Sequence, residues 1–172
     1  MDFFEVIRKR HSYRGAFQPL AVPEEDIHAI LEAGVRAPSG YNQQTTSFIV
    51  VTDADLRQQI AELVPTPALK TAPVIVIPVS SYQVTHESLA FEIEDYGASV
   101  ENIMLAITAK GYAGVWMDGD VKLNNVRGRL GKLLRVPEDR TVRAIIPFGV
   151  PEEEWPQREK QAFEERVHFN QF

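Results

Sequence analysis

Residues 8–14, with the sequence RKRHSYR, gather cationic and hydrogen-bonding side chains near the start of an acidic chain. Arg10, Ser12 and Arg14 alternate, so an extended backbone would point all three side chains to one side, while Tyr13 packs on the other. Two guanidiniums and a hydroxyl form a set of donors suited to an anion such as a phosphate. The alternative is a solvated run of charges without a ligand, which is the commoner case for such runs.

Two further clusters have residue types that suit a ligand. Residues 37–43, APSGYNQ, offer the hydroxyl of Ser39 and the amide of Asn42, and Gly40 would let a flat ligand approach the backbone. Residues 110–119, KGYAGVWMDG, place glycines between a helix and a strand. Each cluster alone can be read as turn chemistry. Together with the arginines, they suit an aromatic phosphate ester.

Composition limits the other functions. The net charge of −6 argues against a nucleic-acid partner, because phosphate binding usually needs a dominant basic face. The absence of cysteine excludes disulfides, thiolate catalysis and cysteine-ligated metal. We expect no metal site, because no two histidines have metal-ligand spacing; they are His11, His28, His86 and His168. No apolar run reaches the length of a signal peptide or a membrane span, so we expect a cytoplasmic protein without membrane association.

Common catalytic motifs are absent as well. The sequence has no G-x-G-x-x-G, no Walker spacing and no G-x-S-x-G, which gives little support to a dinucleotide-binding unit, a P-loop or a serine hydrolase. Acidic residues gather at the start of the longest predicted helix, where they favour the helix dipole rather than a catalytic pair. They are Glu87, Glu92, Glu94 and Asp95. We therefore assign no catalytic side chain.

The elements that must position these clusters mix helical and strand periodicity. The predicted helices cover residues 2–9, 23–37, 53–63, 88–110 and 124–134. The predicted strands cover residues 47–52, 72–80, 113–117 and 141–149. The helix over residues 88–110 is long enough to span a small domain, so we expect it at the centre of one layered α+β domain.

Residues 151–172 differ from the rest of the chain. They are rich in charge, yet they carry large apolar side chains at spacings that fit no single element: Trp155, Phe163, Val167, Phe169 and Phe172. A free tail would rarely carry so many large apolar groups. We expect the tail to lie across another surface, and we favour a partner subunit over its own domain.

The sequence resembles the nitroreductase family of FMN-dependent oxidoreductases over nearly its whole length. Four motifs carry the resemblance, and they stand in the family's order. They are Arg-x-Ser-x-Arg at residues 10–14, Ala-Pro-Ser-x-x-Asn at 37–42, the segment GASVENIMLAITAKGYAGVW at 97–116, and the close PFGVPEE at 147–153 followed by REKQAFEERVHF at 158–169. Any one of them is weak, but the ordered set is specific.

The resemblance implies an α+β nitroreductase-like fold, with a central mixed or antiparallel sheet and helices around the long central helix, in an obligate homodimer. Residues 1–172 would form a single domain whose extension, residues 151–172, crosses to the partner. The implied activity is that of an FMN-dependent oxidoreductase that takes hydride from NADH or NADPH in a ping-pong cycle. The hydride passes through flavin N5 to nitroaromatic, quinone or enone acceptors. Two alternatives remain: a flavin-binding protein with a storage or sensing role, and an enzyme that uses reduced flavin for other chemistry such as dehalogenation.

The resemblance also implies roles for individual residues. Arg10 would lie near the FMN phosphate and Arg14 near the pyrimidine edge of the flavin, and His11 and Ser12 would contribute hydrogen bonds. Residues of the second cluster would reach the flavin from the other subunit; they are Pro38, Ser39, Gly40 and Asn42. The tail cations Arg158 and Lys160 fall where relatives place basic phosphate ligands, although Lys160 replaces a more usual arginine.

One departure from the family pattern concerns the residues after Asn42. The family usually continues Asn-x-Gln-Pro-Trp-x-Phe, whereas this chain has Thr45 and Thr46 in place of the Pro-Trp pair. We expect the pair to shape packing beneath the site rather than to perform chemistry. The replacement leaves the shape of the pocket, and therefore the acceptor, open.

Overall fold

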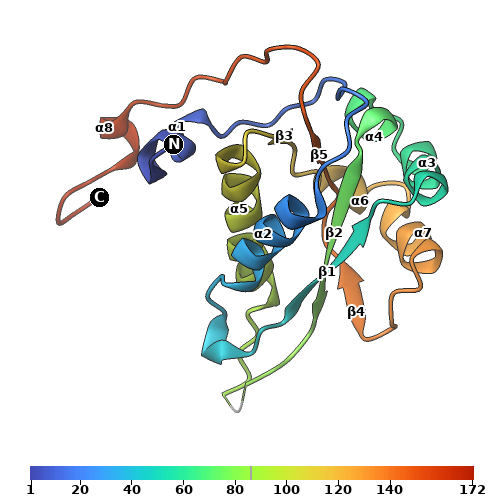
Figure 1. Ribbon diagram of the computed structural model, residues 1–172. Helices are drawn as coiled ribbons and strands as arrows, with labels where there is room; N and C mark the ends of the chain where they lie inside the picture. Colours follow the sequence, from blue (N-terminus) through green and yellow to red (C-terminus); the bar gives the residue numbers. More distant parts are fainter. Residues whose placement is uncertain (86) are drawn as a thin grey trace.

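A computed structural model describes residues 1–85 and 87–172, so His86 lies outside the described residues. Its centre is a sheet with the strand order β1-β2-β5-β3, in which β4 also pairs with β2, and all strand pairs are antiparallel (Figure 1). The strands are β1 (Thr46–Val51), β2 (Val74–Ser81), β3 (Ala113–Gly114), β4 (Arg140–Val142) and β5 (Ile146–Gly149). The prediction of an α+β fold with an antiparallel sheet is confirmed.

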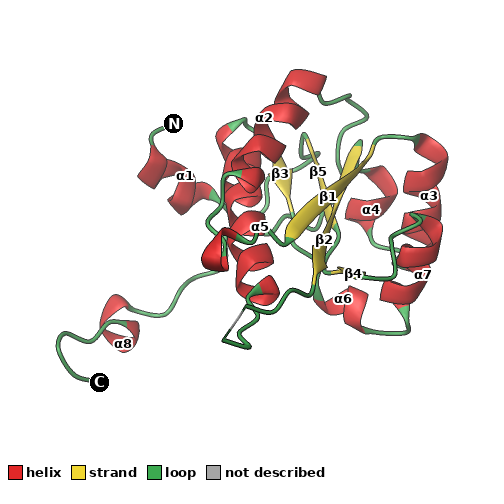
Figure 2. Ribbon diagram, turned by 90° about the horizontal axis from the view of Figure 1, so that it is seen from below, coloured by secondary structure: helices red, strands yellow, loops and turns green. Residues whose placement is uncertain are grey.

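Helices cover both faces of the sheet (Figures 1 and 2). They are α1 (Phe3–Lys9), α2 (Glu24–Val35), the short 3₁₀ helix η1 (Gly40–Asn42), α3 (Ala54–Leu63), α4 (Pro67–Thr71), α5 (Glu92–Ala109), α6 (Gly119–Lys122), α7 (Val126–Leu133) and α8 (Phe163–Arg166). None of the helices in the described part of the chain has the length and apolar character that crossing a membrane requires.

Strand β2 forms the middle of the core, and all eight of its residues are buried. Ile75 and Ile77 pack in one apolar cluster with residues of α3, α4 and α7. Val74 and Val76 pack in a second cluster with residues of α2 and α5. Because successive side chains of a strand point to opposite faces, a strand covered on both sides needs apolar residues at every position. This requirement explains the continuous apolar run of β2.

Helix α5 has 18 residues, which corresponds to a length of about 27 Å at 1.5 Å per residue. It begins at Glu92, four residues later than the predicted start at residue 88. Ser88 has a left-handed backbone (φ 62°), which cannot continue a right-handed helix. The prediction of a helix from residue 88 is therefore wrong at its first turn.

The strand predicted over residues 141–149 is divided into β4 and β5. The pairs Val79↔Val142 and Val76↔Ile146 enclose two residues of β2 but three residues of the neighbouring segment, which is the geometry of a β-bulge. Pro78 lies at this place and has no N–H to donate, although its carbonyl accepts a hydrogen bond from the Arg143 amide (2.9 Å). The bulge turns the Arg143 side chain toward α5.

The start of α2 is tied to the end of α5 by an ionic and hydrogen-bonded contact. The Tyr112 hydroxyl donates to Oδ2 of Asp26 (2.6 Å), and Lys110 Nζ lies 2.8 Å from Oδ1 of the same carboxylate. Burial, together with the neighbouring carboxylate, raises the pKa of Tyr112 to about 12. This contact fixes α2 against the helix that forms the middle of the domain.

The tail follows the sheet but does not join the core. Every residue from 152 to 172 is exposed, and in both views the segment extends away from the sheet (Figures 1 and 2). Phe163 is 61% exposed and Phe169 is 79% exposed, so the apolar groups that suggested a covered tail are uncovered in the single chain. The crossing to a partner subunit stays a prediction.

Candidate functional site

The first part of the site is a cavity of about 310 Å³ between residues 10–14 and the start of the tail at residues 155–160. The carbonyl of Arg10 accepts a hydrogen bond from Nε2 of Gln157 (2.9 Å), and Trp155 packs edge-on against the Tyr13 ring. These contacts hold the start of the exposed tail over the N-terminal segment. The lining residues are Arg10, His11, Ser12, Arg14, Trp155, Pro156, Gln157, Arg158 and Lys160.

The N-terminal segment has the extended geometry that its alternation predicts. Ser12 bridges to Gly114 in parallel orientation, and the Tyr13 amide donates to the Gly114 carbonyl (2.9 Å). Tyr13 is fully buried, which confirms that it packs, while Ser12 and Arg14 on the other side line the cavity. Helix α1 ends at Lys9, so the backbone is free to extend from Arg10 onward.

The cavity is strongly cationic for an acidic chain. Its lining includes Arg10, Arg14, Arg158 and Lys160. Arg10 pairs with Glu101 of α5, whose Oε1 lies 3.5 Å from Nε of Arg10. The Arg10 side chain is only 21% exposed. Nδ1 of His11 donates to the Lys9 carbonyl (2.9 Å), which leaves Nε2 as the nitrogen that faces other groups. This arrangement suits a phosphate, which accepts several charge-assisted hydrogen bonds.

A second cavity of about 520 Å³ shares Arg14 with the first. It is formed because the Ser12–Gly114 bridge sets residues 10–14 beside the segment that follows β3. Its lining residues are Arg14, Thr66, Pro67, Ala68, Val115, Trp116, Met117, Asp118, Gly119 and Asp120. Asp118 is held by Lys122 at 2.6 Å, and this hydrogen bond raises the pKa of Lys122. The site thus has a cationic part and a part with an aromatic and apolar wall, joined at Arg14.

The sequence indicated residues 110–119 as part of the site, but the prediction emphasised two glycines rather than the residues that line the cavity. Gly111 has φ 84° in the turn after α5, and a side chain on Gly114 would meet the Cβ of Phe148 at 3.1 Å. Turn geometry and sheet packing therefore explain these two glycines without a ligand. The members of this segment that line the cavity are Val115, Trp116, Met117, Asp118 and Gly119, and the signal for the first four was a position directly after the glycines.

The loop with Pro38, Ser39, Gly40 and Asn42 lines neither of these two cavities. It lies at the end of α5 away from α1 (Figure 1). A Cβ on Gly40 would meet Cγ of Phe91 at 2.3 Å, so this glycine makes room for a neighbouring ring of its own chain. The approach of a flat ligand to the backbone at Gly40 stays a prediction.

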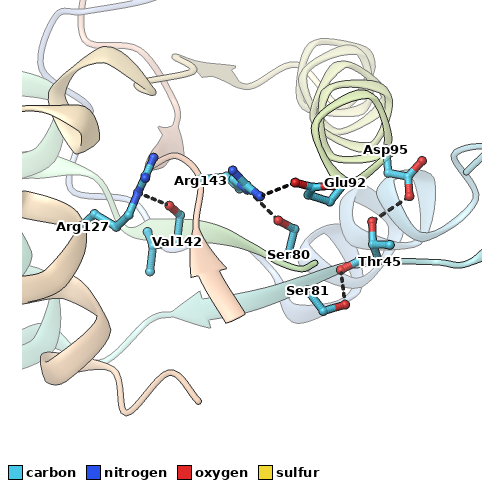
Figure 3. A network of polar contacts seen from close by, with 8 residues as sticks. All are labelled: Thr45, Ser80, Ser81, Glu92, Asp95, Arg127, Val142 and Arg143. Atoms are coloured by element: carbon cyan, nitrogen blue, oxygen red, sulfur yellow. Dashed lines mark hydrogen bonds and ion pairs between the residues drawn. The ribbon is translucent and has the colours of Figure 1, made fainter. Parts of the chain in front are cut away.

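Two of the acids near the start of α5 have specific partners (Figure 3). Glu92 lies 3.5 Å from Nη2 of Arg143, and both side chains are largely buried. Burial lowers the pKa of Arg143, and the Glu92 carboxylate opposes this effect. Asp95 accepts hydrogen bonds from the Gly40 amide (2.8 Å) and from the Thr45 hydroxyl (2.6 Å). Glu92 and Asp95 lie in the first turn of α5, where acids favour the helix dipole as predicted, and they also have these specific partners.

Within residues 1–85 and 87–172, no three side chains of the kinds His, Cys, Asp and Glu gather in a group that could hold a metal ion.

Similarity to known proteins agrees with the fold and with the order of the motifs. The sequence pattern of the Nitroreductase family matches residues 7–66. A protein of Methanothermobacter thermautotrophicus, provisionally named NADH dehydrogenase/NAD(P)H nitroreductase, is 33% identical over 154 residues, which are 89% of this chain and 79% of that protein. The NADPH-flavin oxidoreductase of Vibrio harveyi is 25% identical over 181 residues, covering 98% of this chain and 73% of that protein.

A solved structure has the same fold. The NADPH:FMN oxidoreductase of Vibrio harveyi, in complex with NAD⁺, superposes with a TM-score of 0.85 at 23% identity, over 99% of this chain and 77% of that chain. With a relative that is a third identical over most of both chains, and with the arginine, proline-serine and central-helix motifs in order, the chain belongs to the nitroreductase family.

Proposed function

We propose that this chain is an FMN-dependent NAD(P)H oxidoreductase of nitroreductase type. The observation that carries the proposal is the junction of two cavities at Arg14. FMN joins a phosphate, which carries up to two negative charges, to a flat aromatic ring. A cationic cavity beside a cavity with an aromatic and apolar wall matches these two parts in chemistry and in order.

The donors of the first cavity fit a phosphate. Arg10 and Arg158 offer guanidiniums that can bind phosphate oxygens in pairs, Lys160 adds a point charge, and Ser12 adds a hydroxyl. Glu101 holds the Arg10 side chain from the direction of α5. The whole set comes from a single chain, which supports the assignment of both the N-terminal and the tail cations to one phosphate.

The residues of the second cavity would hold and tune the ring. When bound, FMN would supply the hydride-transfer chemistry that the amino acids lack. Arg14, at the junction, places a positive charge where it stabilises negative charge on the ring and so raises its reduction potential. Trp116 and Met117 give an apolar wall that keeps water from the ring. The chain needs no proton-transfer residue for this task, which agrees with the missing catalytic motifs.

Three exposed features support a homodimer. The loop with Ser39 and Asn42 lies away from both cavities, so it could reach a flavin only in another subunit. Helix α1 exposes Phe3 (63%) and Phe4 (67%), and the tail exposes further aromatic rings. Uncovered apolar groups of this size mark interaction surfaces. We propose that the tail of one chain and the second cluster of the other meet across this interface.

The electron donor and the acceptor follow from the same proposal. The names of the two relatives above contain NADH, NAD(P)H and NADPH, so we propose a nicotinamide donor without a choice between the two. The proposed acceptors are nitroaromatics, quinones or enones, which accept hydride from reduced flavin.

Turnover tests this function. The purified protein, loaded with FMN, should oxidise NADH or NADPH when nitrofurazone or menadione is present. Protein that binds FMN but gives no oxidation with either donor would contradict the enzyme and favour a flavin-binding role in storage or sensing. Protein that takes up no FMN would contradict both.

A further inference from the structure

We propose that Asp95 is a positioning residue for the flavin site, because it holds the loop of residues 37–45 in the shape in which that loop presents Ser39 and Asn42. The inference rests on the proposed function, since it assumes that this loop contacts the flavin of the other subunit. Asp95 itself would touch neither the flavin nor the substrate. Its role would be to fix, from inside its own subunit, a loop that works in the other one.

Asp95 contacts the loop at two places, at Gly40 inside it and at Thr45 at its end. Oδ1 accepts the Gly40 amide at 2.8 Å, and Oδ2 accepts the Thr45 hydroxyl at 2.6 Å (Figure 3). The Asp95 side chain is 3% exposed and Thr45 is 1% exposed. A buried carboxylate is expensive unless donors satisfy it, and charge-assisted hydrogen bonds are short and directional. The two donors therefore tie Gly40 and Thr45 of the loop to α5.

Among the residues that the structure describes, no cationic side chain forms an ion pair with Asp95. The nearby Arg143 is engaged with Glu92 (3.5 Å) and with the Ser80 hydroxyl (2.5 Å). The loop donors thus supply the stabilisation that an ion pair would otherwise give. Losing either donor would leave a carboxylate oxygen buried and unsatisfied, so the protein resists any movement of the loop away from α5.

The loop needs these hydrogen bonds because three of its residues have a left-handed backbone conformation. Tyr41, Asn42 and Gln44 all have left-handed backbones, with φ of 51°, 55° and 50°. Residues other than glycine adopt this region at a cost, and it persists only where the surroundings impose it. Hydrogen bonds inside the loop, such as the Gln44 amide to the Ser39 hydroxyl (3.0 Å), shape the turn but do not place it. The bonds to Asp95 fix the loop to α5, while the Ser81 amide, which donates to the Thr45 carbonyl (3.0 Å), fixes its end to β2.

The same contacts explain what Thr45 does at the position where this chain departs from the family pattern. Thr45 stands where relatives have proline, which has no hydroxyl and could not donate to Asp95. The neighbouring Thr46 has a buried hydroxyl with no hydrogen-bond partner among the residues that the structure describes. The two threonines are therefore not equivalent: Thr45 holds the loop, and Thr46 fills space in β1.

This difference supplies a matched pair of variants. Thr45→Val keeps the shape of the side chain and removes the donor, and Thr45→Ser restores the donor. Thr46→Val makes the same chemical change one residue away, at a hydroxyl that bonds to no described residue. FMN affinity is measured by fluorescence titration of the apoprotein, and exchange of the Gly40 amide is measured by NMR without flavin.

We expect Thr45→Val to weaken FMN binding roughly tenfold, because one hydrogen bond to a charged group is lost. Exchange at Gly40 should accelerate in the same variant. Thr45→Ser and Thr46→Val should bind FMN as the wild type does. Wild-type FMN affinity in Thr45→Val would overturn the inference, and so would an equal loss in Thr46→Val.

The two readouts separate this inference from the proposed function. If the wild-type protein bound no FMN, the proposed function would fail and the role of Asp95 in the flavin site would fail with it. Unchanged Gly40 exchange in Thr45→Val would then show that Asp95 does not hold the loop at all. If the wild type binds FMN and Thr45→Val accelerates Gly40 exchange without weakening FMN, only the link between the loop and the flavin is wrong.

Discussion

Replacing Arg10 by alanine removes the most buried cation of the cationic cavity. Its side chain is 21% exposed, whereas Arg14, Arg158 and Lys160 are exposed residues. A hydrogen bond between charged groups contributes about 1.5–3 kcal/mol, so FMN affinity should fall roughly 10- to 150-fold. We expect the upper part of this range, because the substitution also leaves the Glu101 carboxylate unopposed beside the phosphate.

Glu101 allows a second test of the assignment of Arg10 to the phosphate. Its side chain is 49% exposed, and pairs of this kind contribute about 0.2–1 kcal/mol. The double variant Arg10→Ala, Glu101→Gln should therefore recover up to about fivefold of the lost affinity, because the repulsion of the phosphate is removed. A recovery would assign part of the loss to charge rather than to a change in packing.

Fluorescence titration of the apoprotein with FMN, at several salt concentrations, measures these changes. The matched control is Arg36→Ala, which removes an arginine that is 78% exposed and also pairs with a glutamate, Glu32, at 2.7 Å. It should bind FMN as the wild type does. Unchanged affinity in Arg10→Ala, or an equal loss in Arg36→Ala, would refute the assignment of Arg10 to the phosphate.

Three further predictions test other parts of the structure. Gly40→Ala should destabilise the protein by about 1–3 kcal/mol in urea unfolding, because its Cβ would meet Phe91 at 2.3 Å. The control Gly131→Ala, with open space around the added atom, should be neutral or stabilising. Equal effects of the two substitutions would contradict the packing at Gly40. The folded protein binds the Tyr112 phenol proton more tightly than the unfolded chain, because the pKa of Tyr112 is raised to about 12. This contribution to the free energy of unfolding is full below pH 10.0 and is lost as the pH rises to about 12. Urea unfolding as a function of pH should show this loss, and the Tyr112→Phe variant should not show it. Phe169→Ser, at a residue 79% exposed, should weaken dimerisation in sedimentation experiments without changing the circular dichroism, and an unchanged dimer would speak against a tail that crosses to the partner.

The longest periodic patterns predicted the fold most accurately. The apolar run of β2 and the helical spacing of α2 both correspond to elements within a residue or two of their predicted bounds. Such patterns succeed because burial of one face, or of both faces, depends on local spacing. The short helices α4 and α6 were missed because helices of five and four residues hold too few residues to show a period.

Features that depend on distant contacts could not be predicted from the sequence. The bulge opposite Pro78 requires knowledge of which strand pairs with β2, and the reason for Gly40 is a ring fifty-one residues away. The alternation of Arg10, Ser12 and Arg14 correctly indicated one cationic side, because it depends only on neighbouring residues. The contribution of Trp116 was missed, because it follows from the pairing of Ser12 with Gly114.

An anaerobic titration of the FMN-loaded protein with NADH, and then with NADPH, tests the central claim most directly. We predict that the purified chain binds FMN stoichiometrically and that an equivalent amount of at least one donor bleaches the flavin absorption band. Air or a quinone should then restore the band. Bound flavin that keeps its full absorbance with both donors would contradict the proposed oxidoreductase.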